Sequence, residues 1–147
     1  MDEDELTIRA LMEESHTNAV NKGWYDPPKT FTEALALFHS EISEALEEHR
    51  DGRGYNEVYW KIGNNTGTAY NNEIWTDDPF QGLPESVRMH LCDNGHAKPE
   101  GIPIELADLL IRVADTCKHY EIDLVRALYL KMAYNETRSH RHGDKVV

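Results

Sequence analysis

Hydrophobic residues recur every three to four positions along four stretches of the chain, a spacing that predicts amphipathic helices. The four predicted helices cover residues 2–21, 30–50, 104–120 and 123–138. The second helix has the clearest start, because Thr30 and Glu33 stand three positions apart in a capping-box pattern. Pro103 suits the first turn of the third helix, and Asp123 can cap the fourth.

The third and fourth predicted helices carry the apolar residues expected of a core. Between residues 104 and 120 the chain is apolar almost all round, which predicts a helix buried on most of its faces. The fourth helix is expected to point four apolar side chains inward, namely Leu124, Val125, Leu128 and Met132. Four helices, one of which is buried at the centre, predict an all-α fold, a four-helix bundle formed by a single domain over residues 1–147.

Residues 51–100 lack helical periodicity and are rich in Gly, Asn, Asp and Pro, so they form an irregular insert between the second and third helices. Two short apolar runs, Val58–Trp60 and Ile74–Trp75, flank a Gly-rich and Asn-rich stretch and predict a small β-hairpin. Residues 84–91 can form a short helix. An insert this long inside a small domain points to a functional lid or an oligomer contact.

The charge of the chain narrows its possible partners. Lys and Arg total 15 against 27 Asp and Glu, for a formal net charge of −12, so a polynucleotide would be repelled at long range. No apolar run approaches the length of about 20 residues that spans a bilayer, and none resembles a signal peptide, so we expect a cytoplasmic protein without a membrane partner. Cys92 and Cys117 do not make a disulfide framework in that compartment.

The most informative residues are acidic and lie on two of the predicted helices. Glu41, Glu44 and Glu48 share one flank of the second helix, beside its apolar stripe. The third helix carries a comparable stripe, made of Glu105, Asp108, Arg112 and Asp115. Because carboxylates on an otherwise apolar helix are costly to bury unpaired, we expect a hard divalent cation such as Mg²⁺ between the two stripes. The alternative is a solvated helix face on which the arginine pairs with one of the aspartates.

A cationic patch stands out against this acidic background near the end of the chain. Lys131, Asn135 and Arg138 fall on one side of the fourth helix, and Lys145 follows in the tail. Lys and Arg bind phosphate oxygens, and Asn can orient a sugar or a base edge. The alternative is a basic helix end that complements the helix macrodipole. Carboxylates for a metal, together with cations for phosphate, indicate a nucleotide polyphosphate as the substrate.

The acidic motifs and their flanking phrases resemble those of the MazG-like all-α nucleoside triphosphate pyrophosphohydrolases. The resemblance lies in Glu41-x-x-Glu44 within ALALFHSEISEALEEHR and in Glu105-x-x-Asp108 within KPEGIPIELADLLIRVAD. It extends to NAVNKGWYDPPKTFTEALAL before the first motif and to LKMAYNETRSHRHGDK near the end of the chain. The long insert departs from the pattern of the shorter members of that family.

The resemblance implies a hydrolase that cleaves a (d)NTP to (d)NMP and pyrophosphate and assembles as a homodimer or homotetramer. The implied metal ligands, for two or more Mg²⁺ ions or for Mn²⁺ as a substitute, are Glu41, Glu44, Glu105 and Asp108. The implied contacts to phosphate or sugar are Lys131, Asn135, Arg138 and Lys145, and the aromatic candidates for base stacking are Trp24, Tyr25, Trp60 and Trp75. Glu44 or Glu48, where not occupied by metal, would accept the proton of the attacking water.

Alternatives remain open both within and outside this family. Within it, the substrate is dUTP or dCTP, a broad set of nucleotides, or the (d)GTP favoured by a phage branch; we expect a purine triphosphate, dGTP first. Outside it, a di-iron bundle needs two Glu-x-x-His motifs, and the predicted helices hold only Glu13-x-x-His16. His90, Cys92 and His96 lack the second pair of a zinc site. A non-enzymatic helical dimerisation module is the alternative of another class.

Overall fold

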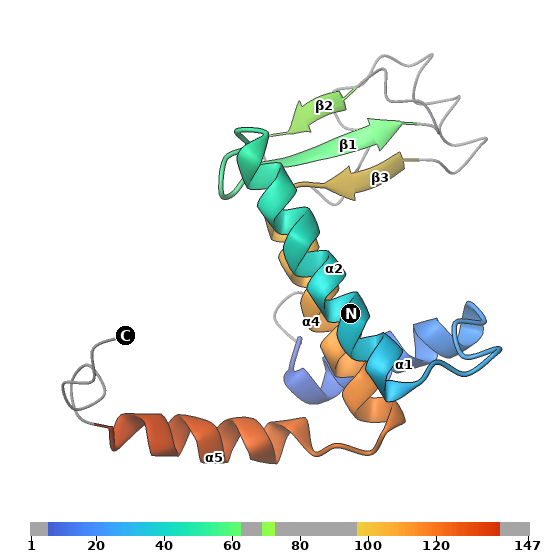
Figure 1. Ribbon diagram of the computed structural model, residues 1–147, viewed down its shortest axis with the longest axis vertical. Helices are drawn as coiled ribbons and strands as arrows, with labels where there is room; N and C mark the ends of the chain where they lie inside the picture. The colour runs from blue at the N-terminus through green and yellow to red at the C-terminus, as the bar shows by residue number, and fades with distance from the viewer. Residues whose placement is uncertain (1–5, 63–68, 73–96, 139–147) are drawn as a thin grey trace. The chain divides into compact units, whose positions relative to one another are not determined.

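The computed structural model describes residues 6–62, 69–72 and 97–138, which form four helices and three short strands (Figure 1). The helices are α1 (Ile8–Asn21), α2 (Phe31–Arg50), α4 (Ile102–His119) and α5 (Leu124–Glu136), and the strands are β1 (Val58–Ile62), β2 (Ala69–Asn72) and β3 (Ala97–Glu100). The predicted all-α fold with an insert between the second and third predicted helices is confirmed. Residues 84–91, predicted as a short helix, lie outside the described residues. None of the helices described is long and apolar enough to cross a membrane.

The chain divides into two compact units, and both α2 and α4 contribute residues to each. The terminal unit comprises Met1–Ala34 with Ile111–Val147, and so contains α1, α5 and the second half of α4. The sheet unit comprises Leu35–Leu110, and so contains most of α2, the three strands and the first half of α4. The two predicted acidic motifs therefore lie in the sheet unit, whereas the predicted basic patch lies in the terminal unit.

Local hydrogen bonds determine where the helices begin. The predicted capping box of α2 is confirmed, because the Glu33 N–H donates to Thr30 Oγ1 at 3.2 Å and the Thr30 N–H donates to Glu33 Oε2 at 2.7 Å. The carboxylate of Asp123 likewise caps α5 by accepting a backbone N–H at 3.0 Å. α1 begins at Ile8, after a threonine N-cap, which is later than the predicted start at residue 2.

The insert contributes a small antiparallel sheet with the strand order β2-β1-β3. A hairpin forms as predicted, but its second strand is residues 69–72, with Asn72 opposite Val58. The predicted second strand at residues 74–75 lies outside the described residues. On its other side β1 pairs with β3, which the sequence pattern did not predict. Pro99 weakens the strand signal of β3, and the proline is tolerated because β3 lies at an edge of the sheet described.

The turn from β3 into α4 requires a glycine at position 101. Gly101 has a φ of 122°, in a region that L side chains rarely adopt, and a Cβ at this position would collide with the carbonyl oxygen of Glu57. The Gly101 carbonyl also accepts the Glu105 N–H at 3.1 Å, which closes the first turn of α4. This close backbone approach positions Glu100 and Glu105 at the junction between the sheet and the helix.

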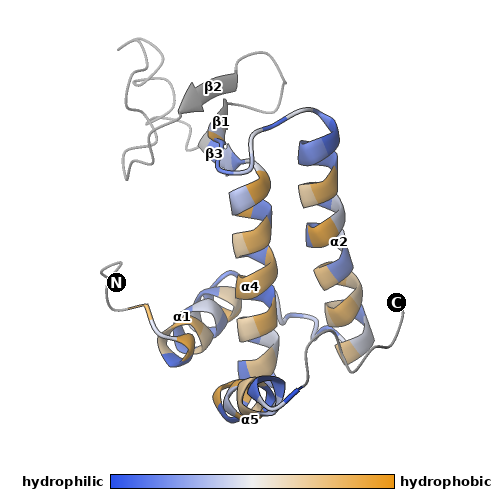
Figure 2. Ribbon diagram, turned by 90° about the vertical axis from the view of Figure 1, so that its left-hand side faces the viewer, coloured by the Kyte–Doolittle hydropathy of each residue, from blue (hydrophilic) through white to orange (hydrophobic). Residues whose placement is uncertain are grey.

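Two expectations about burial are wrong. α4 is not buried on most of its faces, since Leu106, Leu110 and Ile111 expose 47%, 59% and 37% of their surfaces. α5 has no buried residue, and Leu128 and Met132, which we expected to point inward, are 39% and 62% exposed. Apolar positions recur along both helices (Figure 2), but the described part of the chain supplies no surface that covers them.

Polar contacts join α1 to the second half of α4 within the terminal unit. The Tyr25 hydroxyl donates to Asp115 Oδ2 at 2.9 Å, and Nδ1 of His16 lies 2.8 Å from Asp115 Oδ1. The Tyr25 ring stacks on His119 with 4.1 Å between the ring centroids. Burial and the hydrogen bond to Asp115 raise the pKa of Tyr25, so its hydroxyl keeps its proton and remains a donor. Asp115 therefore serves to hold this unit together.

Candidate metal centre

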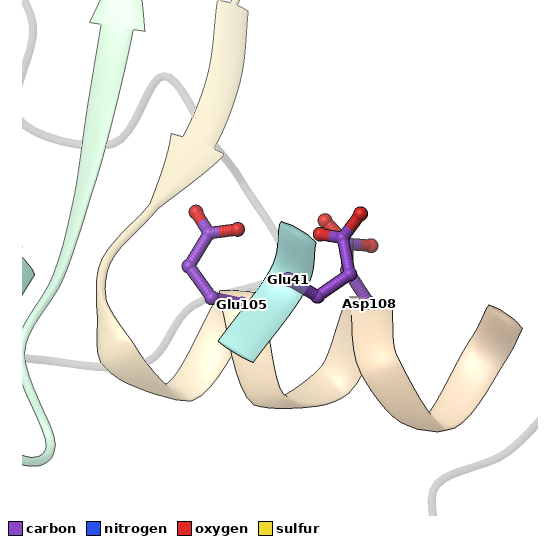
Figure 3. Close-up of side chains that lie close together, drawn as sticks. All are labelled: Glu41, Glu105 and Asp108. Atoms are coloured by element: carbon purple, nitrogen blue, oxygen red, sulfur yellow. The ribbon is translucent and has the colours of Figure 1, made fainter. Parts of the chain in front are cut away.

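Three carboxylates from two helices converge within the sheet unit (Figure 3). Glu105 and Asp108 are three positions apart on α4 and rise from the same face of that helix, and Glu41 comes from α2. Each residue offers an oxygen that lies within 4.8 Å of the corresponding oxygens of the other two. We call Glu41, Glu105 and Asp108 the carboxylate triad. The structure thus brings together three of the four residues predicted to bind metal.

The triad is largely removed from solvent. Glu41 is 3% exposed and Glu105 is 1% exposed, while Asp108 is half-buried. Oε2 of Glu105 is buried and has no hydrogen-bond partner among the described residues. Several like charges held together away from water repel one another and lose hydration, and a divalent cation with oxygen ligands relieves both costs. The triad therefore fits a hard divalent cation such as Mg²⁺.

Glu105 also belongs to a second group of carboxylates. Glu48 from α2 and Glu100 from the end of β3 each offer an oxygen within 4.8 Å of an oxygen of Glu105 and of each other. Glu100 is 6% exposed, and Glu48 is half-buried. We call Glu48, Glu100 and Glu105 the junction group, because its members come from two helices and from the strand that leads into α4.

The surroundings of Glu105 disfavour its ionised form in the metal-free chain. Burial, a hydrogen bond with Glu100 and the nearby charges of Glu100 and Glu44 raise the pKa of Glu105 to about 7. Lys98 opposes this effect, but its ammonium is bound to Glu100 Oε1 at 3.0 Å, and its side chain is 59% exposed. Near neutral pH, Glu105 is therefore only partly ionised in the metal-free chain.

Two further side chains contact Glu48 within the sheet unit. The hydroxyl of Tyr59, which is 3% exposed, donates to Glu48 Oε1 at 2.8 Å. Burial and this bond raise the pKa of Tyr59, so the hydroxyl stays protonated. Nε of Arg53 lies 3.8 Å from Glu48 Oε2, while the same guanidinium binds Glu57 Oε1 at 3.0 Å. Oε2 of Glu48 is buried and has no hydrogen-bond partner among the residues described.

The remaining acidic predictions differ in their outcome. Glu44, predicted as a metal ligand, is exposed and belongs to neither carboxylate group, although its charge acts on Glu105. Glu48, predicted only as a catalytic candidate, lies in the junction group. Sequence reasoning missed Glu100 and Tyr59. The sequence feature that could have identified Glu100 is its position directly before Gly101 at the start of a helix. No pattern in the insert identifies Tyr59 as a site residue.

The predicted substrate-binding residues of α5 lie in the terminal unit. Lys131, Asn135 and Arg138 are all exposed. Nζ of Lys131 is 5.0 Å from the centroid of the Tyr134 ring, and the guanidinium carbon of Arg138 is 5.8 Å from it. Both cations thus flank one aromatic ring on the surface of the helix. Lys145 lies outside the described residues.

The aromatic candidates for base stacking are not equivalent. Trp24 is 44% exposed, with Nζ of Lys29 at 5.3 Å from its ring centroid, so it presents an accessible ring beside a cation. Tyr25 already stacks on His119 and binds Asp115 through its hydroxyl. The side chain of Trp60 and the whole of Trp75 lie outside the described residues.

Two alternative metal sites that the sequence offers have different outcomes. The di-iron motif Glu13-x-x-His16 has its side chains engaged with the protein, since Glu13 binds Lys118 and His16 contacts Asp115. In the described part of the chain, neither belongs to a group of three converging ligands. The zinc candidates at residues 90–96 lie outside the described residues.

The chain was also compared with family models, with curated proteins and with solved structures, and none of these comparisons gave a match.

Proposed function

We propose that the chain is a metal-dependent nucleoside triphosphate pyrophosphohydrolase, which converts a (d)NTP and water to a (d)NMP and pyrophosphate. The observation that carries the proposal is the carboxylate triad, in which Glu41 and Glu105 are almost fully buried and their oxygens converge with one of Asp108. It is further supported by the basic residues of α5 and by the resemblance of the two acidic motifs to MazG-like enzymes. Because such substrates are soluble nucleotides, the proposal retains the expected cytoplasmic location.

In this proposal, Glu41, Glu105 and Asp108 hold Mg²⁺, for which Mn²⁺ substitutes. The bound ions supply neutralisation of the triphosphate charge and lower the pKa of a coordinated water. Glu44 lies outside both carboxylate groups and is exposed, so its carboxylate is available to accept the proton of the attacking water. The residue that accepts the proton of the attacking water needs to lie close to the metal ligands without being one of them.

The basic and aromatic residues of the terminal unit complete the proposal. Lys131 and Arg138 bind phosphate oxygens, Asn135 contacts the sugar, and Trp24 stacks on the base. The preferred substrate is a purine triphosphate, dGTP first, with the dUTP and dCTP or broad-specificity alternatives decided by the same assay. The active form is a homodimer or homotetramer.

The proposal is tested by incubating the purified chain with each dNTP and NTP, in Mg²⁺ or in EDTA, and resolving the products by anion exchange. We expect monophosphate and pyrophosphate in Mg²⁺ and none in EDTA. Glu41→Gln should reduce the rate by about 100-fold or more, as for loss of a catalytic metal ligand or its support. Glu47→Gln is the matched control, since Glu47 lies on the same helix and only pairs with Arg50 on the surface.

The same assay separates the proposal from its rivals. No product from any nucleotide, with a folded protein that still binds Mg²⁺, would contradict the hydrolase and favour a non-enzymatic module. Full activity of the Glu41→Gln variant would remove Glu41 from the metal site. A product mixture of diphosphate and phosphate would show that a different bond of the triphosphate is cleaved.

A further inference from the structure

A pocket of about 330 Å³ lies within the terminal unit, which contains no member of either carboxylate group. α1 lines it with Arg9, Met12 and Glu13, which stand three and four positions apart and so share one helix face. The end of α4 and the turn that follows it supply the rest of the lining. Ligand pockets commonly enclose about 300 to 1,000 Å³, so this one suits a small molecule.

The pocket has an apolar part to which all three segments contribute. Cys117 of α4 is 8% exposed, Met12 of α1 is half-buried, and Ile122 of the turn is 38% exposed. Burial raises the pKa of the Cys117 thiol, so the thiol stays protonated and packs as a small apolar group. The methionine side chain adapts its shape to what it contacts. These three side chains form a surface for an apolar group of the ligand.

The charged side chains of the pocket are paired with one another only in part. Lys118 binds Glu13, so these two charges largely cancel. Within the described part of the chain, the Arg9 guanidinium and the Glu121 carboxylate make no ion pair or hydrogen bond. Asp123 uses Oδ1 to cap α5, which leaves Oδ2 as an acceptor. The lining thus offers one cation from α1 and two carboxylates from the turn.

Glu121 occupies a position that usually belongs to glycine. α4 ends in a Schellman motif, in which the Ile122 N–H donates to the Cys117 carbonyl at 2.8 Å and the Glu121 N–H donates to the Lys118 carbonyl at 3.2 Å. Glu121 therefore has a left-handed φ of 56°, where a side chain is less favourable than a glycine. Binding of a ligand by this carboxylate would account for the cost.

We propose that this pocket binds a free α-amino acid with an apolar side chain. The ligand carboxylate pairs with Arg9, whose planar guanidinium matches it, and the ligand ammonium donates to Glu121 and Asp123. The ligand side chain packs on the apolar part of the lining. A ligand with only one of these charges leaves a charged side chain unpaired, so a zwitterion is preferred. The site is independent of the proposed function, because no residue of its lining is a predicted metal or phosphate ligand.

The test is a titration of the full chain with L-leucine, followed by NMR of the isotope-labelled methionine methyl groups. The Met12 signal, which Met12→Leu assigns, should shift with a Kd of about 1 mM or below, as for a small ligand held by two charge-assisted contacts. Isocaproate lacks the ammonium and isoamylamine lacks the carboxylate. Each should bind at least about tenfold more weakly than leucine, because one side of the pocket is left unpaired.

Two variants separate binding from folding. Arg9→Gln and Glu121→Gly should each raise the Kd for leucine by about tenfold or more, because each removes one charged contact. Glu121→Gly should do so without lowering Tm, because glycine adopts the left-handed φ freely. Glu14→Gln is the control, since Glu14 is exposed on α1 and does not line the pocket. It should bind leucine as wild type does.

Three results would overturn the proposal. The first is a Met12 signal that does not move up to about 10 mM leucine, well above the expected Kd. The second is isocaproate or isoamylamine binding as tightly as leucine, which would show a site for a single charge. The third is an unchanged Kd in both Arg9→Gln and Glu121→Gly. If Glu121→Gly does not fold, Glu121→Gln removes the same charge and takes its place.

Discussion

At the scale of single residues, the chain concentrates its unusual chemistry on Glu105. This side chain is 1% exposed, belongs to both carboxylate groups and has an oxygen without a hydrogen-bond partner among the described residues. Its raised pKa follows from burial and from the charges of Glu100 and Glu44. In the absence of metal, such a group costs stability whenever it is ionised. Stability is given up at the position where a cation would be bound.

The pH dependence of stability provides a test of this cost. The pKa of Glu105 rises from 4.5 to about 7 on folding, so the folded chain binds more protons than the unfolded chain between these values. Stability from this group is therefore fully present below pH 4.5 and is lost as the pH rises through about 7. The loss amounts to about 3 kcal/mol, since one pKa unit corresponds to about 1.4 kcal/mol.

The measurement is urea unfolding in EDTA at about pH 5 and pH 8, for wild type and Glu105→Gln. We expect the variant to lose most of the wild-type fall in unfolding free energy across this interval, because its amide does not ionise. Glu47→Gln, on the exposed surface of α2, should retain the wild-type pH dependence. An unchanged pH dependence in Glu105→Gln would contradict the raised pKa.

A second residue-scale prediction concerns phosphate binding by α5. Lys131→Ala should raise KM by about tenfold with a much smaller change in kcat, because the lysine binds ground-state and transition-state phosphate alike. Arg126→Ala is the matched control, since Arg126 is an exposed cation on the same helix outside the predicted patch. Steady-state kinetics with the preferred nucleotide measure both. Equal effects of the two variants would indicate general electrostatics instead of a phosphate site.

At the scale of elements, the candidate site depends on how two helices and one strand are joined. Glu41 and Glu48 are seven positions apart on α2, two turns along one flank, so each can meet α4 at a different level. α4 begins directly after Gly101 and places Glu105 in its first turn. The strand β3 delivers Glu100 to the same level. A change that moves the turn at Gly101 should therefore disturb both carboxylate groups together.

Gly101→Ala tests this junction. The added Cβ would collide with the Glu57 carbonyl and would force a φ that L residues avoid, so we expect a loss of at least about 2 kcal/mol of stability and weaker Mn²⁺ binding. Gly54→Ala is the control, because its φ is not in the restricted region and its Cβ would meet Glu57 at an ordinary 3.6 Å. Thermal melts and Mn²⁺ titrations measure both effects. Wild-type stability of Gly101→Ala would show that the turn adapts.

At the scale of the whole molecule, the exposed apolar residues are the main unexplained feature of a single chain. On α5, Leu128, Tyr129 and Met132 are 39%, 73% and 62% exposed and share one face of the helix. On α4, Leu106 and Leu110 are 47% and 59% exposed. Monomeric proteins seldom leave successive apolar positions of a helix in water. A second copy of the chain is the partner that the sequence resemblance implies.

Light scattering after gel filtration tests this assembly. We expect a mass of two or four times 16.9 kDa for wild type, and a shift toward one chain for Met132→Glu, because a charge on the apolar face of α5 costs more when that face is covered. Ala127→Glu, on the opposite face of α5, is the control and should keep the wild-type mass. A wild-type mass of one chain at micromolar concentration would contradict the oligomer.

Much of the local structure could be predicted from short-range patterns. The capping box of Thr30 and Glu33, the cap at Asp123 and the first strand of the hairpin depend on residues close in sequence, and the structure confirms them. Burial was predicted less well. The apolar periodicity around Leu110 and Met132 marks a face suited to packing, but it does not say whether the same chain covers that face.

The sequence by itself determined the helical elements, the starts of α2 and α5, and the positions of Glu41, Glu105 and Asp108 on two helix faces, because these follow from helical periodicity and capping. Only the tertiary structure decided that Glu44 stays outside the carboxylate groups and that Glu100 joins Glu48 and Glu105. The reason is that Glu100 comes from β3, whose pairing with β1 and turn at Gly101 depend on contacts far apart in the chain. Local patterns carry no record of such contacts.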